Sequence, residues 1–363
     1  MSFLVNLTMK VLHLAAGNRW TGAAAPAFAE VAALREAGVD AHFAYVGGYK
    51  LEAKIGHLDF THPIIARAQN PFSFLRTARS LDWLLKHHGF DVVHAHLTYD
   101  HWLARSVTRD RGMLLARTFH NRRVVRSDPF TKSLITRSAL ICVTNDELRD
   151  ATPIRDRNPL FTPPPIDRGE FSADGPNARA TYGIAPQTKV ITTIGKLSKG
   201  RGFELVLETF ARVRPEIADT KLMIIGHGEH RPALERLSRD LGINDGVTWA
   251  GYHEDDLAAH YRASDILLFT ARGSDEGHRA ILEAMSCGAV PVVAPLEGVG
   301  ALLGDADARL IASAHTADAL ARSVISLLRE DLAPLQRLLL QRSDQFAYAR
   351  AADRLMRAYA KIL

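Results

Sequence analysis

The stretch DILLFTARGSDEGHRAILEAMSCGAVPVVAP, residues 265–295, indicates the fold class. It opens with a buried apolar run, DILLFTA, and continues through a turn into a helical pattern that ends at Gly288. A second apolar run, AVPVVAP, follows directly. Strand–helix–strand order is typical of a parallel sheet with helices on both faces. The stretch therefore predicts an α/β unit.

The same alternation fills most of the chain. Before residue 158 the predicted strands are KVLHLAA (10–16), DAHFAYV (40–46), DVVHAH (91–96), GMLLARTFH (112–120) and ALICVTN (139–145). After residue 171 they are TKVITTIGKL (188–197), TKLMIIGHG (220–228), GVTWAGY (246–252) and the two runs quoted above. Helical patterns separate most of these strands, which predicts two doubly wound, Rossmann-like units in tandem.

A proline-rich segment, NPLFTPPPIDRGEF (158–171), interrupts the alternation. Three consecutive prolines stiffen the backbone and exclude helix, so this segment is predicted to join two domains. We expect an N-terminal domain over 1–165 and a C-terminal domain over 166–342. The final segment, 343–363, is a basic amphipathic helix that we expect to pack on a domain. Ligands of such sheets bind at the carboxyl ends of the strands, which predicts a cleft lined by the loops that follow them.

Composition limits the class of protein. The 363 residues are too many for one ordinary core and suit two domains. Two cysteines, Cys142 and Cys287, favour a reducing compartment over a disulfide scaffold. No apolar run approaches the roughly 20 residues of a membrane span. Residues 1–165 hold 21 Lys+Arg and 14 Asp+Glu, so the positive charge lies in the N-terminal half. That half could meet an anionic partner, or its charge could simply keep the protein soluble.

Two loops are candidates for binding anions. GNRWTGAA (17–24) lies between a strand and a helix, where backbone N–H groups can meet an anion, but glycine is also ordinary in such turns. GKLSKGRG (195–202) gathers Lys196, Lys199 and Arg201 before a helix. Cations oppose the dipole at a helix N-terminus, so their placement indicates a bound polyanion such as a diphosphate. The alternative is an exposed basic loop.

A group of acidic residues follows the strand at 265–271. Asp275 and Glu276 are predicted to lie just before a helix, and Glu283 one turn inside it, among small apolar neighbours. A carboxylate in such surroundings usually has a partner. The backbone N–H groups of 277–279 are expected to point toward the cleft. Carboxylates can accept hydrogen bonds from hydroxyls, and backbone amides can bind anions. A nucleotide sugar offers both kinds of group.

Histidines mark the N-terminal half. His120 ends a predicted strand, where it could be structural, act as an acid or base, or hydrogen-bond a sugar hydroxyl. His94 and His96 point to the same side of another strand. They could both bind one metal ion, but a catalytic zinc is held by three protein ligands, and no third ligand is evident in the sequence. The preferred interpretation of the pair is core or cleft wall.

With these motifs in place, the chain resembles the retaining glycosyltransferases of the GT-B fold, family 4 (glycosyl transferases group 1). The family's signature is Glu-Gly-Phe-Gly, four residues, then Glu-Ala-Met. DEGHRAILEAM (275–285) is similar to it in register, with Asp275 in place of the first Glu. Lys196 and Arg201 resemble the family's Arg and Lys, five residues apart, with the identities exchanged. The hinge PPPID (163–167) and the last helix also resemble the family.

The resemblance implies roles for particular residues. Glu283 would hold the donor's ribose hydroxyls, Asp275 or Glu276 the sugar hydroxyls, and Lys196 and Arg201 the departing diphosphate. The last helix would cross back to the N-terminal domain. The other residues expected in the donor site are Gly22, which faces the diphosphate, Gly195, Gly226, Tyr252, Gly277, His278 and Arg279. His120 would touch the transferred sugar and count among the catalytic residues with Asp275, Lys196 and Arg201.

The implied reaction is retaining transfer of a sugar from a nucleotide-diphosphate donor by front-face attack, with no cofactor and no metal. The acceptor would be a glycan or a lipid-linked molecule. Alternatives are a sugar phosphorylase or nucleotide-sugar epimerase of the same fold, or a non-catalytic scaffold that binds the nucleotide sugar. Basic and aromatic residues in 70–89 suit peripheral contact with an anionic membrane at its cytoplasmic face. No nucleic-acid recognition motif accompanies the charge.

Overall fold

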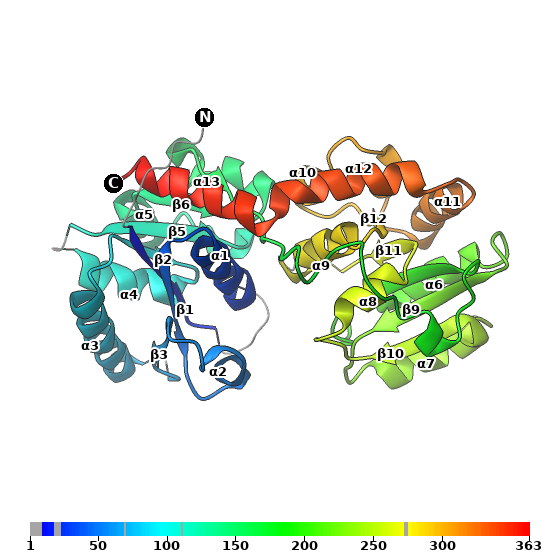
Figure 1. The fold of residues 1–363 in the computed structure, drawn as a ribbon, viewed down its shortest axis with the longest axis horizontal. Coiled ribbons are helices and arrows are strands. Elements are labelled where there is room, and N and C mark those ends of the chain that lie inside the picture. Colours follow the sequence, from blue (N-terminus) through cyan, green and yellow to red (C-terminus); the bar gives the residue numbers. More distant parts are fainter. Residues whose placement is uncertain (1–8, 18–22, 69, 110–111, 272–274) are drawn as a thin grey trace. The chain divides into compact units, whose positions relative to one another are not determined.

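The computed structural model describes residues 9–17, 23–68, 70–109, 112–271 and 275–363, without the side chains of 275–277. The chain divides into two units (Figure 1). Unit 1 takes the residues up to Pro165 together with Phe346–Leu363, and unit 2 takes Ile166–Gln345.

Unit 1 is built on a parallel sheet with the strand order β3-β2-β1-β4-β5-β6-β7. Every neighbouring pair in this sheet is parallel, as strand–helix alternation requires. The strands are β1 (Lys10–Ala15), β2 (Asp40–Val46), β3 (Thr61–Ile65), β4 (Val92–Ala95), β5 (Leu114–Phe119), β6 (Leu140–Val143) and β7 (Leu160–Phe161). The helices are α1 (Ala24–Glu36), α2 (Lys50–Ile55), α3 (Pro71–His88), α4 (Thr98–Thr108), α5 (Pro129–Arg137) and α13 (Tyr348–Ala360).

Helices cover both faces of this sheet, because side chains of a strand alternate between its faces. Val11 and Ala15 of β1 join a core with α1 and α13, while Leu12 and Leu14 join a core with α3 and α4. The C-terminal helix α13 lies against α1 (Figure 1) and buries Tyr359 completely. The last helix is thus part of the N-terminal unit's core.

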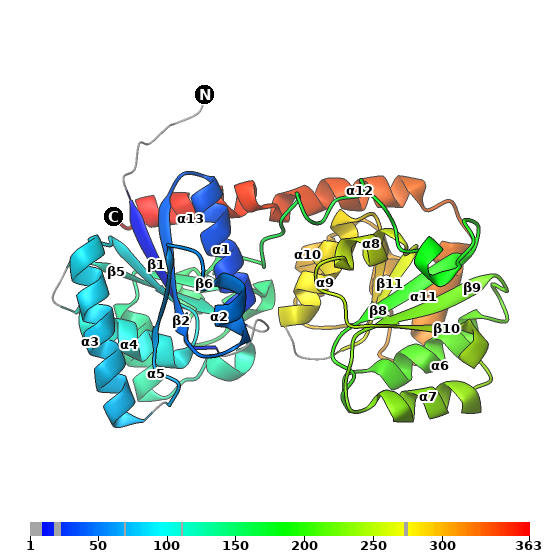
Figure 2. The same cartoon turned by 60° about the horizontal axis from the view of Figure 1, so that its bottom comes forward.

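Unit 2 is built on a second parallel sheet, with the strand order β10-β9-β8-β11-β12. Helix α6 packs against α11 and α7, and α9 packs against α8 and α12 (Figure 2). The strands are β8 (Lys189–Ile194), β9 (Thr220–Ile225), β10 (Val247–Gly251), β11 (Ile266–Phe269) and β12 (Val290–Val293). The helices are α6 (Phe203–Val213), α7 (Arg231–Asp240), α8 (Leu257–Arg262), α9 (Asp275–Ser286), α10 (Val299–Leu303), α11 (Ala317–Leu328) and α12 (Ala333–Ser343).

The predicted fold class is confirmed by these two sheets: both units are parallel α/β and Rossmann-like. Two strands were not predicted. β3 carries Pro63 and exposes its middle, which is typical of an edge strand without a clear apolar pattern. β7 is two residues long and lies inside the segment assigned to the linker. In the part of the chain that the structure describes, no helix is both long and apolar enough to cross a membrane.

Candidate functional site

The loops after β8 and β9 pack against each other backbone to backbone. The Leu197 N–H donates to the carbonyl of His227 (2.9 Å), and the Gly195 N–H donates to that of Ile225 (3.0 Å). Gly226 adopts a φ of 139°, and a Cβ built on it would lie 1.9 Å from the Gly195 carbonyl oxygen. The two glycines expected in the donor site therefore permit a close backbone approach at the carboxyl edge of the unit 2 sheet.

The cationic residues stand on the same loop. Lys196 is 55% exposed and forms a long ion pair with Glu229 (3.6 Å). Such a surface pair is weak, so the ammonium group is available to another anion. Arg201 is half-buried, and within the described ranges neither it nor Lys199 forms an ion pair. These positive charges without strong partners are what a polyanion site requires.

A hydrogen bond brings this loop to the start of the acidic stretch. The Thr270 hydroxyl, directly after β11, donates to the carbonyl of Gly202 (2.9 Å). Gly202 has a φ of 81°, and a Cβ there would lie 2.4 Å from the Thr270 hydroxyl oxygen. The cationic loop and the segment that leads into α9 thus meet at one edge of one sheet.

The start of α9 corrects one expectation. Asp275 and Glu276 were predicted to precede the helix, yet α9 begins at Asp275, and Glu283 lies two turns in. Acidic residues are favourable in a first turn, where they offset the helix dipole, so the helix begins earlier than predicted. Only N–H groups of the first turn lack an acceptor within the helix. This start shifts the expected anion-binding amides from 277–279 to 275–277.

Glu283 is buried (3% exposed), and two side chains contact it. The Tyr261 hydroxyl donates to Oε2 (3.1 Å), and Nε of Arg279 donates to Oε1 (2.8 Å). Burial raises the pKa of Glu283, while the charge of Arg279 and the bond from Tyr261 act against that rise. A carboxylate has about four acceptor positions, so these two bonds leave capacity for a ligand hydroxyl.

Two other predicted donor residues differ in exposure. The ring of His278 is buried, and its Nε2 donates to the carbonyl of Glu297 (2.9 Å). Tyr252 is 60% exposed after β10, and its hydroxyl donates to Glu254 (2.8 Å). Tyr252 is therefore available to stack on a planar ligand, whereas the His278 side chain is held inward.

In unit 1, His120 lies directly after β5 and is buried (4% exposed). Its Nε2 is 3.1 Å from Nδ1 of His96. Burial, together with the charge of Arg117, lowers the pKa of His120 to about 3, so its imidazole is neutral. Gly22, predicted for the same unit, lies outside the described residues, and so do the side chains of Asp275 and Glu276.

The neighbours of the histidine pair were not predicted from the sequence. His94 and His96 lie in the core of unit 1, and β1 pairs with β4 so that His13 stands beside His94. Glu30 of α1 reaches the same place. A glutamate within the apolar run AFAEVAAL was a usable signal, because buried carboxylates are rare without partners.

Comparison with known proteins follows the same division of the chain. Residues 174–346 match the family described as glycosyl transferases group 1, and residues 20–164 match glycosyltransferase family 4. Among curated relatives, N-acetyl-alpha-D-glucosaminyl L-malate synthase of Bacillus anthracis is 24% identical over 319 residues, which is 82% of each chain.

Solved structures share the fold over the full length. A glycosyltransferase from Rickettsia africae superposes with a TM-score of 0.82 at 15% identity, covering 98% of this chain and 99% of its own. HepE from Anabaena, in complex with UDP, gives a TM-score of 0.79 at 15% identity, covering 97% of this chain and all of its own (100%). The chain belongs to the family 4 glycosyltransferases and has their GT-B fold.

Proposed function

We propose that this glycosyltransferase moves a sugar from a nucleotide-diphosphate donor to a glycan or lipid-linked acceptor, with retention of the anomeric configuration. One observation carries the proposal. The hydrogen bond from Thr270 to Gly202 brings the cationic loop and the segment leading into α9 to one edge of the unit 2 sheet. Diphosphate-binding cations, helix amides and carboxylates then meet where such sheets bind ligands.

Each group has a role in this proposal. Lys196, Arg201 and the first amides of α9 neutralise the diphosphate as it leaves. Glu283 accepts hydrogen bonds from the ribose, and Asp275 or Glu276 accepts them from the sugar. His120, in unit 1, contacts the sugar as a neutral imidazole. Catalysis is then positioning together with stabilisation of the leaving group, and a phosphate oxygen takes the acceptor's proton. Protein cations take the place of a metal ion at the diphosphate.

Relatives support the donor class and leave the base open. HepE from Anabaena was solved with UDP and with UDP-glucose, and a pneumococcal O-GlcNAc transferase with UDP and GlcNAc. A mycobacterial relative, 33% identical over 147 residues, is named for GDP-mannose. A donor screen should therefore include nucleotides of both uracil and guanine.

The surface of α3 supports a peripheral membrane contact as part of the proposal. Phe72 (86% exposed), Leu75 and Trp83 are exposed large apolar side chains on one face of this helix. Arg76 and Arg79 are exposed on the same face. Aromatic and cationic groups together favour binding to anionic lipid, so we propose that this helix binds the cytoplasmic face of a membrane, near a lipid-linked acceptor.

Flotation with anionic vesicles tests the membrane contact. Wild type should float at low salt, and a double variant with Phe72→Ser and Trp83→Ser should not. Flotation of the variant at the wild-type level would contradict the contact. The donor experiment below is independent of this outcome.

A thermal-shift screen against UDP, GDP, ADP and their sugars tests the donor site, since a ligand that binds the folded state raises Tm. One nucleotide family should raise the wild-type Tm, and a variant with Lys196→Ala and Arg201→Ala should lose most of that shift. A variant with Arg236→Ala and Arg239→Ala, two exposed residues of α7, is the matched control, because it removes two charges outside this loop. A full shift in the double variant would refute the assignment of the diphosphate site.

A further inference from the structure

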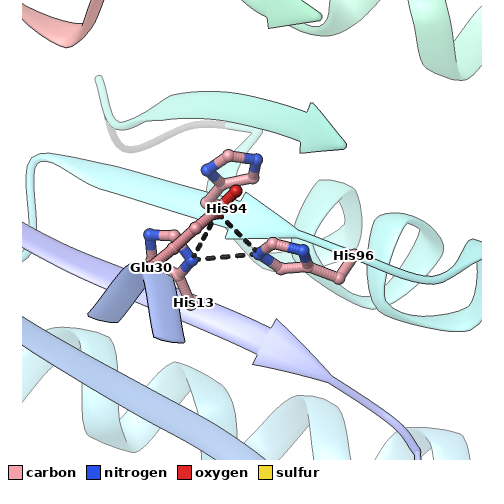
Figure 3. A group of neighbouring side chains, drawn as sticks. All are labelled: His13, Glu30, His94 and His96. Carbon is pink, nitrogen blue, oxygen red and sulfur yellow. Dashed lines mark hydrogen bonds and ion pairs between the residues drawn. The ribbon is translucent and has the colours of Figure 1, made fainter. Parts of the chain in front are cut away.

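Four side chains that could bind a metal ion meet in the core of unit 1 (Figure 3). They are His13 of β1, Glu30 of α1, and His94 and His96 on β4 and its end. Their exposed fractions are 0%, 3%, 0% and 1%. Histidine and glutamate are rarely buried this completely without a partner that repays the loss of water.

Three of these side chains form a triangle of possible ligand atoms (Figure 3). His13 Nδ1 is 2.9 Å from His96 Nε2, and Glu30 Oε2 is 3.6 Å from the first and 3.7 Å from the second. A triangle with these sides has a circumscribed radius of about 2.0 Å, so one point lies at a zinc–ligand distance from all three atoms.

We propose that His13, Glu30 and His96 bind one Zn²⁺ ion in the core of unit 1. Two imidazoles and a carboxylate are a ligand set that zinc prefers. His94 lies against the triangle, its ring centroid 4.7 Å from those of both His13 and His96. The site is closed to solvent and joins β1, α1 and the end of β4.

The groups around the triangle fit this assignment. Histidines that bind metals use their second ring nitrogen for a hydrogen bond that fixes the ring. His13 Nε2 is 3.3 Å from the Tyr359 hydroxyl, and His96 Nδ1 is 3.1 Å from His120 Nε2. Tyr359 also lies 2.6 Å from Nδ1 of His94. Each nitrogen assigned to the metal is thus the one turned away from an outer partner.

The carboxylate of the triangle also fits a bound cation. Glu30 Oε2 has no hydrogen-bond partner among the described residues. A divalent ion would compensate the charge of the buried carboxylate and use one lone pair of His13 and one of His96.

A second group, His253, Asp256 and His260, offers a control. The Asp256 side chain is 60% exposed, and His253 already bonds to it and to the carbonyl of Ala250. These hydrogen bonds account for the group without a metal ion. We assign no site there.

The test uses the full chain without a histidine tag. Metal is removed with a chelator, and Zn²⁺ is titrated while bound metal and Tm are measured. We expect one Zn²⁺ per chain and a rise in Tm on the order of 5 °C at saturating zinc. A stripped wild type that binds no Zn²⁺ would overturn the proposal without any variant.

Variants then locate the ion. Glu30→Gln, which keeps size and shape, should weaken zinc binding by about 100-fold or more, and Tyr359→Phe by about 10-fold. His253→Gln should bind as wild type does. Circular dichroism confirms that each variant is folded, and Co²⁺ absorption reports the same site. Zinc affinity retained in Glu30→Gln, or lost in His253→Gln, would refute the assignment.

Discussion

Replacing Glu283 with Gln should weaken donor binding and leave unit 2 folded. The amide keeps an acceptor for the Tyr261 hydroxyl but loses the charge that Arg279 contacts at 2.8 Å. A hydrogen bond to a charged group contributes about 1.5–3 kcal/mol. Because Arg279 is 32% exposed, water replaces part of that loss. The raised pKa of Glu283 also means that its ionised form is costly in the core. We expect a net destabilisation of about 1 kcal/mol, or 2–4 °C in Tm.

The effect on the donor should be larger. Loss of a charged acceptor for the ribose hydroxyls costs about 1.5–3 kcal/mol, which corresponds to roughly 10–100-fold in Kd by calorimetry. Tyr261→Phe is the matched control, since it removes the other contact of Glu283 and keeps the carboxylate. It should lower Tm by a similar amount and leave donor affinity unchanged. Equal donor affinity in Glu283→Gln and wild type would refute the ribose role.

Two further predictions concern stability. Burial and the charges of His42 and His88 lower the pKa of His62 to about 4, so the folded state disfavours its protonation. The free energy of unfolding that neutral His62 contributes is fully present above pH ~6.5 and is lost as pH falls toward ~4. His62→Gln should therefore reduce the loss of unfolding free energy over this pH range by about 1 kcal/mol, which the Tm measured against pH reports. An unchanged profile would contradict this. Gly226→Ala places a Cβ 1.9 Å from the Gly195 carbonyl oxygen. It should lower the free energy of unfolding, measured in urea, by about 3 kcal/mol or more. Gly300→Ala is the control: a Cβ there meets open space, so the free energy of unfolding should change by less than about 0.5 kcal/mol.

Much of the fold could be predicted from local patterns. The strand predicted over 40–46 is β2 with the same bounds, because its buried residues form an unbroken run between turns. β3 was not predicted because an edge strand needs no continuous apolar run, and the three middle residues of β3 are partly or fully exposed. Short-range patterns identify central strands and leave edge strands ambiguous.

The sequence predicts which residues lie in the candidate site better than it predicts which side chains contact one another there. The positions of Lys196, Arg201 and the acidic stretch after strands follow from the fold, since doubly wound sheets bind ligands at that edge. The contact between Glu283 and Tyr261 could not be predicted from the sequence, because Tyr261 lies on another helix, α8. His13 and His96 are 83 residues apart, and only the pairing of β1 with β4 brings them together.

Retaining transfer is tested by following the anomeric proton by NMR while the enzyme acts on the donor found in the screen. Slow transfer to water suffices, provided that spectra are recorded before the released sugar mutarotates. We expect the first product to have the donor's anomeric configuration and its formation to require Lys196 and Arg201. Release of the opposite anomer, a donor sugar epimerised without release, or no release with any acceptor would contradict retaining transfer.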